Sequence, residues 1–181
     1  MSGKPPGLKI YRGLMSPHDT QRLLAECHTL PPPPGNPLFR YFGDFGDNAD
    51  VEAVREWMLP WGDHMVGQGL FKQRPNQYRV CSWRGDLSDQ FKWHIDSTRH
   101  GERILAVCLT DGRTIGFRPR AKHQEPYLLH LDAGDAYLIR ATARWQWLHR
   151  VMPTGQGRGG GESFVISYKR PKASANRTSR R

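Results

Sequence analysis

The segment ERILAVCLTDGRTIGFR, residues 102–118, holds two short apolar runs joined by a turn sequence. The runs 103–110 and 113–118 are rich in β-branched and apolar residues, and Asp111-Gly112 lies between them. Asp-Gly is a dipeptide that two-residue hairpin turns favour, because glycine adopts positive φ without strain. The pattern therefore predicts a β-hairpin near the middle of the chain.

The same alternation of short apolar runs and turn sequences continues on both sides of this segment, from Pro75 towards the end of the chain. Ala133-Gly134-Asp135 marks another tight turn between apolar runs. Roughly eight short strands at this spacing are typical of a β-sandwich or a jelly roll. The expected strands are 76–83, 91–95, 103–110, 113–118, 126–131, 136–140, 145–151 and 163–169.

The part of the chain before Pro75 has helical patterns instead. Ser16 and Pro17 form an N-cap with proline at the first helical position, which predicts a helix over 16–28. The run ADVEAVREWM, residues 49–58, predicts a second helix that ends before Pro60. We expect an α+β protein, in which the two N-terminal helices pack on one sheet of a double-stranded β-helix, the jelly roll. Its parts are a helical and loop support region (1–74), the jelly-roll core (75–170) and a disordered basic tail (171–181).

Composition limits the environment and the partners of the chain. Its 181 residues carry 27 Lys and Arg against 17 Asp and Glu, a net charge of +10, which favours a polyanionic partner such as a nucleic acid. The sequence has no apolar run of membrane-spanning length and no secretory signal pattern at its start, so we expect no membrane association. The widely spaced Cys27, Cys81 and Cys108 make no disulfide or zinc pattern and predict buried, reduced thiols of an intracellular protein.

The stretch FKWHIDS, residues 91–97, places His94 and Asp96 on the same side of one expected strand. An unpaired carboxylate inside a barrel is costly, and a bound cation would offset that cost. Among the other histidines, His149 is the best-placed third ligand, because it lies in the apolar strand pattern WQWLHRVMP. Two histidines and one carboxylate with open positions are the ligand set of non-haem Fe(II) oxygenases, which also bind a keto acid and O₂. The alternative is a pair of polar residues that only happen to share a strand.

Several segments together resemble the AlkB-like branch of the Fe(II)- and 2-oxoglutarate-dependent dioxygenases. They are PNQYRVCSW (75–83), KWHIDS (92–97), the expected hairpin (102–118), LLHLDAGDAYLIRATARWQWLHRV (128–151) and SFVISYKR (163–170). The resemblance implies a jelly roll with iron held by His94, Asp96 and His149, and with 2-oxoglutarate as co-substrate.

The last strand departs from the family pattern, which begins with an arginine that binds the distal carboxylate of 2-oxoglutarate. If the apolar positions Phe164, Ile166 and Tyr168 face outward, alternation directs the intervening positions to the site. These are Ser163, Val165, Ser167 and Lys169. Ser163 then stands where the arginine is expected, and Ser167 and Lys169 border the co-substrate.

The strand over 76–83 departs as well, since Cys81 and Trp83 replace the asparagine and tyrosine that the family places beside the keto acid. Arg79 shares a face with both. We therefore predict that Arg79 or Lys169 takes over the role of the missing arginine, with Arg158 and Arg170 as flanking candidates.

The resemblance and the charge together predict oxidative demethylation or hydroxylation of a nucleic acid, with a protein side chain as the other substrate class. Trp145 and Trp147 would flank the approach to His149, where they either stack on a base or pack on both faces of their strand. The competing hypothesis is a catalytically degenerate relative that serves as a basic nucleic-acid-binding or structural component. Ser163 and the altered 76–83 strand support that hypothesis, and the intact ligand set opposes it. A structural zinc site is disfavoured, because such sites are closed and usually include thiolates.

Overall fold

The computed structural model describes residues 3–29, 39–41, 58–83, 92–121, 124–152 and 161–168. Two strands and two helices come first: β1 (Leu8–Tyr11), α1 (Pro17–Thr29), β2 (Phe39–Tyr41) and α2 (Met58–Gly67). They are followed by β3 (Gln77–Trp83), a 3-10 turn (Thr98–His100), β4 (Arg103–Cys108), β5 (Arg113–Pro119) and β6 (Tyr127–Leu131). The chain continues with β7 (Ala136–Arg140), α3 (Ala141–Trp145), β8 (Trp147–Val151) and β9 (Gly161–Ser167).

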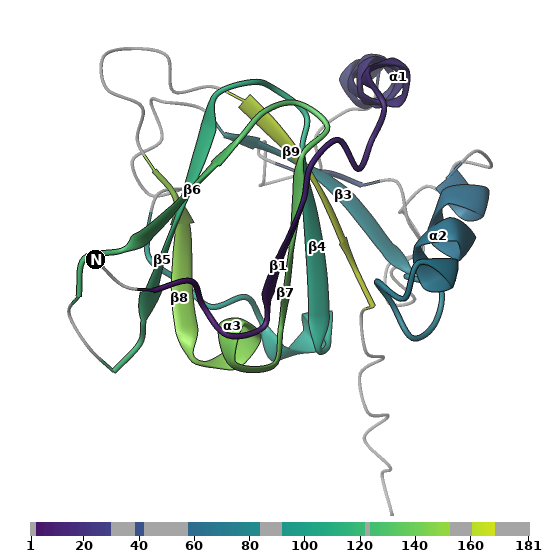
Figure 1. Ribbon diagram of the computed structural model, residues 1–181. Helices are drawn as coiled ribbons and strands as arrows, with labels where there is room; N and C mark the ends of the chain where they lie inside the picture. Colours follow the sequence, from purple (N-terminus) through teal and green to yellow (C-terminus); the bar gives the residue numbers. More distant parts are fainter. Residues whose placement is uncertain are drawn as a thin grey trace, which may run out of the picture.

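The strands form two sheets that face each other across a barrel-like interior (Figure 1). The larger sheet has the order β1-β7-β4-β9-β3-β2 and the smaller the order β6-β5-β8, and every pairing in both is antiparallel. This architecture is a jelly roll, as the strand pattern predicted.

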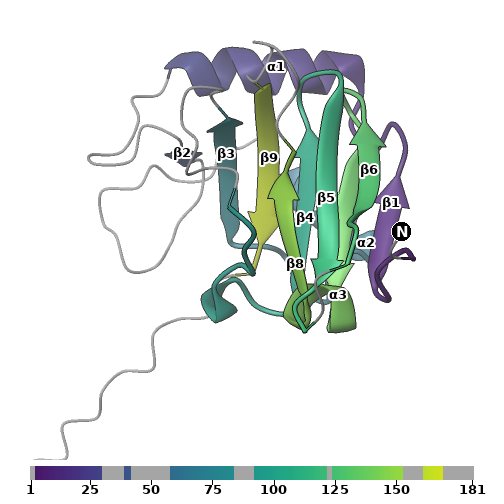
Figure 2. The same cartoon turned by 90° about the vertical axis from the view of Figure 1, so that its left-hand side faces the viewer.

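Buried side chains fall into two clusters, one on each face of the larger sheet. The outer cluster joins sheet residues such as Val80, Leu105 and Phe164 to Leu23 of α1 and Met65 of α2. The inner cluster fills the space between the sheets with residues such as Ala106, Phe117 and Val165. Figure 2 shows α1 lying across one end of the strands. Alternation along β9 is visible in this division, because neighbouring residues of the strand belong to opposite clusters.

The start of α1 follows the predicted capping pattern. The backbone N–H of Asp19 donates to the Ser16 hydroxyl oxygen at 3.1 Å, and Pro17 is the first helical residue. The end of the predicted second helix is wrong, because Pro60 lies within the first turn of α2. A proline is tolerated there, since the missing N–H would have no partner inside the helix. Residues 49–57 of that prediction lie outside the described residues.

The predicted hairpin around Asp111-Gly112 is also wrong. The turn exists, and Gly112 has the positive φ (70°) that such a turn requires. However, β4 belongs to the larger sheet and β5 to the smaller one, so the turn joins two sheets and the strands do not pair. A turn sequence specifies the local reversal, whereas the sheet that receives each strand depends on packing elsewhere.

Three short elements escaped the sequence prediction. β1 and β2 pair with β7 and β3 in the larger sheet, and α3 replaces the first residues of the strand expected over 145–151. Trp145 therefore ends a helix while Trp147 begins β8, so the two do not share one strand. Each of these elements has five residues or fewer, which is too short for a periodic signal.

Two further observations concern thiols and membranes. Cys27, Cys81 and Cys108 are all buried and free, as predicted. No helix among the described residues is both long and apolar enough to cross a membrane.

Candidate metal centre

His94 and His149 are brought together by a single antiparallel bridge. The backbone N–H of His94 donates to the carbonyl of His149 at 3.1 Å, and the N–H of His149 donates back to His94 at 2.9 Å. Directly opposite residues of such a pair project to the same face. The two imidazole rings consequently lie 4.4 Å apart, measured between their centroids.

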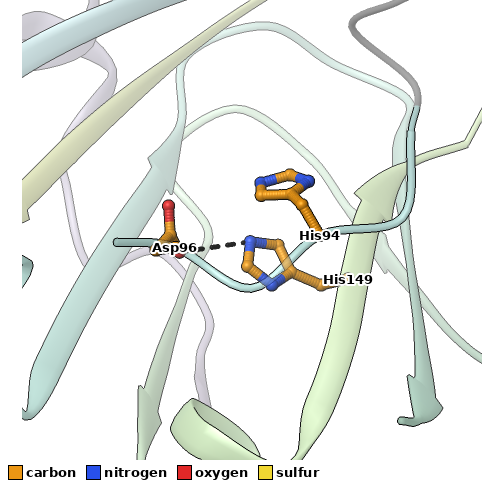
Figure 3. A group of neighbouring side chains, drawn as sticks. All are labelled: His94, Asp96 and His149. Atoms are coloured by element: carbon orange, nitrogen blue, oxygen red, sulfur yellow. Dashed lines mark ion pairs between the residues drawn. The ribbon is translucent and has the colours of Figure 1, made fainter. Parts of the chain in front are cut away.

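Asp96 completes the group two residues beyond His94. Its Oδ2 lies 3.3 Å from Nε2 of His149, and one ligand atom from each of the three residues lies within 4.8 Å of the others. Figure 3 shows the three side chains converging, with Asp96 and His149 joined by the ion pair. His149 is only 8% exposed. Within the described residues, no other group of three His, Cys, Asp or Glu side chains converges in this way.

The three side chains line one end of an interior cavity of about 260 Å³. Apolar side chains make most of its wall: Ile95, Ile104, Ala106, Ile139, Val151 and Val165. Arg79, Cys81 and Tyr137 are the principal polar groups that line it beyond the three converging residues. A few convergent polar groups in an apolar cavity are the usual composition of a small-molecule site.

The electrostatic environment of the three side chains favours the binding of a cation. Burial opposes ionisation of Asp96, but the charges of His149 and Arg79 and the hydrogen bond from His149 outweigh it, so the pKa of Asp96 lies well below its ordinary value. Burial and the neighbouring His149 lower the pKa of His94, which keeps its ring neutral. An ionised carboxylate and a neutral imidazole are the protonation states that metal coordination needs.

Arg79 places a cation beside this group. Its Nη2 lies 3.7 Å from Asp96 Oδ1, and both side chains are largely buried. Burial raises the pKa of the neighbouring Cys81 thiol to about 11, although Arg79 opposes this. Cys81 is not part of the converging group of ligand atoms.

A chain of hydrogen bonds runs from Arg79 into the larger sheet. His100 Nε2 lies 3.4 Å from Arg79 Nη1, and His100 Nδ1 lies 2.5 Å from Gln77 Oε1. The hydroxyl of Ser167 donates to the same Gln77 oxygen at 2.6 Å. Because arginine only donates and the amide oxygen only accepts, these contacts place a proton of the His100 imidazole on Nδ1. Ser167, predicted to border the co-substrate, thus fixes Gln77 and through it the position of Arg79.

The remaining predicted site residues have different outcomes. Ser163 and Val165 point into the interior as alternation predicted, with Val165 on the cavity wall, while Phe164 and Ile166 face the helices. Lys169, Arg158, Arg170 and the basic tail lie outside the described residues, as does the side chain of Trp83.

Several polar residues of the interior were not predicted from the sequence. Gln77, Arg113 and Arg144 are buried, His100 is half-buried, and the half-buried Tyr137 lines the cavity. Tyr137 carried a signal, since it alternates with the apolar residues of its strand. Arg113 and Arg144 carried no such signal, because buried and exposed arginines occur in similar turn and helix sequences.

No family model matches this sequence, and no curated protein matches it. Solved structures do resemble it. OsALKBH1 aligns with a TM-score of 0.61 at 12% identity, covering 92% of this chain and 100% of that one. A prolyl-4-hydroxylase from Pseudomonas putida has a TM-score of 0.59 at 14% identity, with 91% and 93% coverage. A 2OG-Fe(II) oxygenase family oxidoreductase from Burkholderia pseudomallei has a TM-score of 0.62 at 14% identity, with 91% and 85% coverage. The chain therefore has the fold of the 2-oxoglutarate oxygenases, including an AlkB homologue, as the sequence motifs predicted.

Proposed function

We propose that this chain is an Fe(II)- and 2-oxoglutarate-dependent oxygenase. The observation that carries the proposal is the convergence of His94, Asp96 and His149 at one end of an apolar cavity. Three ligands from one side leave the remaining positions of an ion open towards that cavity, which is the arrangement of non-haem Fe(II) oxygenases. A closed structural zinc site would need a fourth protein ligand, and among the described residues no fourth His, Cys, Asp or Glu joins the group.

The donor set fits iron and its co-substrate. His94 and His149 would supply imidazole nitrogens and Asp96 a carboxylate oxygen, all at the mouth of the same cavity. Iron bound there would couple oxidation of a substrate C–H bond by O₂ to decarboxylation of 2-oxoglutarate. When the oxidised carbon is an N-alkyl group, hydroxylation releases it as an aldehyde, which amounts to demethylation.

The residues around the ligands have roles of their own. Arg79 holds Asp96 ionised and presents positive charge at the metal end of the cavity, where a keto acid carboxylate would lie. Burial raises the pKa of Tyr137 far above its ordinary value, so its hydroxyl remains a hydrogen-bond donor. The apolar walls exclude water and thereby strengthen these contacts.

We further propose a nucleic acid as the substrate class, with a protein as the alternative. Trp93 lies on the outer face of the smaller sheet, opposite in direction to His94, and the guanidinium groups of Arg118 and Arg150 each lie 4.6 Å from its ring centroid. Together with the net charge of +10, this aromatic and basic surface suits a polyanion whose bases can stack.

The oxygenase proposal is tested by anaerobic reconstitution. Purified protein is loaded with Fe(II), 2-oxoglutarate is added, and the visible metal-to-ligand charge-transfer absorption is recorded. We expect the band in the wild-type protein and none in Asp96→Asn. Iron bound without any such band would instead favour the catalytically degenerate relative that Ser163 suggests.

The substrate proposal is tested by the binding of single-stranded oligonucleotides to the full chain at several salt concentrations. We expect an affinity that falls steeply and linearly on a log–log plot as salt rises. Binding that is insensitive to salt, or absent at low salt, would redirect the search to protein substrates.

A further inference from the structure

Arg113 is a charged residue on the inner face of the smaller sheet. It begins β5, alternates with Ile115 and Phe117 of the inner cluster, and is only 5% exposed. Its strand neighbour across β6 is Leu131, which is also buried. An arginine in such a position loses most of its hydration, and the loss is costly unless another group replaces the water.

The protein itself satisfies this guanidinium only in part. Nη2 of Arg113 is buried without a hydrogen-bond partner in the described part of the chain, and no acidic side chain there forms an ion pair with it. The Cys108 thiol is a side-chain partner, but it is uncharged, because burial raises its pKa. Glu162 lies close enough to favour the charge of Arg113 but forms no ion pair with it, so the spare donor can bind an added anion.

The guanidinium lies against the first residue of β9. A Cβ atom on Gly161 would overlap with Arg113 Nη2, so only glycine leaves space for the arginine at this position. Gly161, Ser163 and Val165 alternate along the inner face of β9. The positive charge therefore stands next to Ser163, the position at which the last strand lacks its expected arginine.

Residues next to this position line the cavity, although Arg113 and Ser163 themselves do not. Cys108 of β4 and Cys81 of β3 are both register partners of Ser163, and Cys81 lines the cavity. The next inward position on β9, Val165, pairs with Arg79, which touches Asp96. Along β9, the layer that holds Arg79 and Val165 is therefore nearest to the metal centre. The layer of Cys81 and Ser163 comes next. Gly161, with Arg113 against it, lies beyond that layer. Arg79 thus lines the cavity, whereas Arg113 lies beyond the residues that line it.

We propose that Arg113 binds the distal carboxylate of 2-oxoglutarate, taking the role of the arginine that is missing at position 163. This inference rests on the proposed function. It assigns the two cations to the two ends of one dicarboxylate: Arg79 acts at the metal end and Arg113 at the other. Guanidinium suits this role, because it can donate two parallel hydrogen bonds to a carboxylate.

The test compares two keto acids on the Fe(II)-loaded full chain by anaerobic titration calorimetry. One is 2-oxoglutarate, and the other is 2-oxopentanoate, which has the same carbon chain but no distal carboxylate. We expect the wild-type protein to prefer 2-oxoglutarate, and Arg113→Met to weaken 2-oxoglutarate binding by about 10- to 100-fold. Binding of 2-oxopentanoate should change less than about threefold. Arg120→Met, which removes an exposed arginine just after the same strand, should leave both affinities unchanged.

Two further variants distinguish the loss of the carboxylate contact from a loss of folding. Gly161→Ala should displace the guanidinium and reduce the same preference, and Arg113→Lys should retain part of it. Thermal unfolding without ligand should show Arg113→Met to be no less stable than wild type, because the substitution removes a buried charge.

The outcomes separate this inference from the proposed function. If the wild-type protein binds both keto acids equally, or if Arg113→Met keeps the preference, Arg113 is not the anchor, although the oxygenase proposal stands. If the iron-loaded wild type binds neither keto acid, the proposed function is wrong and the assignment of Arg113 falls with it.

Discussion

The backbone carbonyl of Asp96 accepts a hydrogen bond from Nη1 of Arg144 at 3.1 Å. The same guanidinium donates through Nη2 to the carbonyl of Ser97 at 2.7 Å and through Nε to that of Gly101 at 3.1 Å. Arg144 is 1% exposed, and its cation also stacks on Trp145. One arginine of α3 therefore fixes the turn that follows the metal ligands, and the position of Asp96 depends on it.

Arg144→Met should weaken both the fold and the metal centre. It leaves three buried or half-buried carbonyl groups without their donors, which we expect to cost about 2 to 4 kcal/mol in the free energy of unfolding. Affinity for Fe(II) should fall about 10- to 100-fold, as it does when a metal ligand loses its supporting partner. Urea unfolding and metal titration measure the two effects. Arg120→Met removes the same charge from an exposed side chain and should change neither.

Comparing Asp96→Asn with Arg79→Met should distinguish the loss of a metal ligand from the loss of a neighbouring charge. Asp96→Asn removes the anionic oxygen itself, so Fe(II) affinity should fall by more than the about 10- to 100-fold expected for loss of an outer partner. Arg79→Met removes a positive charge close to the ion and should lower metal affinity little or raise it. It should still weaken 2-oxoglutarate binding, because it removes a cation from the metal end of the cavity. Equal loss of metal affinity in both variants would contradict this division of roles.

The sequence allowed the metal ligands to be predicted because strand alternation is a strict rule. Alternation was used to place His94 and Asp96 on one face, and His149 was the best-placed third histidine. The strand expected over 91–95 is itself wrong, because among the described residues of that range only His94 forms a bridge, and Asp96 lies outside the strands. The inward direction of Ser163 and Val165 followed from the same alternation. These inferences need only the period of a strand and no knowledge of which strands are neighbours.

What the sequence did not reveal depends on contacts between distant segments. Asp111-Gly112 specifies a turn, but only packing decides that β4 and β5 enter different sheets. From the sequence Arg113 and Arg144 look like surface residues, because arginine is rarely buried. Their burial follows from Gly161 and from the carbonyl groups of 96–101, which are remote in the sequence.

Tyr78→Phe should change the response of the protein to alkaline pH. Tyr78 is fully buried, its hydroxyl donates to the carbonyl of Pro75 at 3.1 Å, and burial raises its pKa to about 12. Since the unfolded pKa is about 10, the folded state resists ionisation. Its contribution to stability is complete below pH 10 and is lost as the pH rises from 10 to 12.

Denaturant unfolding between pH 7 and 12 measures this effect. At pH 7 the variant should be less stable by about 0.5 to 1.5 kcal/mol, because a buried hydrogen bond is lost. Above pH 10 the wild-type free energy of unfolding should fall more steeply than that of the variant, by up to about 1.4 kcal/mol per pH unit. Tyr127→Phe, on the smaller sheet, controls for loss of a tyrosine hydroxyl as such. Parallel pH profiles for wild type and Tyr78→Phe would show that ionisation of Tyr78 is not opposed by the fold.

The surface formed by Trp93, Arg118 and Arg150 should contribute phosphate contacts if the partner is a nucleic acid. Each contact to a single strand adds about 0.7 to the slope of log affinity against log salt. Replacing both arginines by glutamine should therefore lower that slope by about 1.4, and weaken binding at low salt most. Fe(II) affinity should be unchanged, because these side chains lie on the face of the sheet opposite to His94 and His149.

The matched control is the double replacement of Lys9 and Lys72 by glutamine, which removes the same charge from exposed lysines of β1 and of the segment after α2. Long-range attraction depends mainly on net charge and falls within about 10 Å at 0.1 M salt, so this control should alter binding only slightly. An equal effect of the two double variants would mean that net charge alone attracts the polyanion. A larger effect of the arginine pair locates the contact at Trp93, where a base can stack beside the phosphates that the guanidinium groups bind.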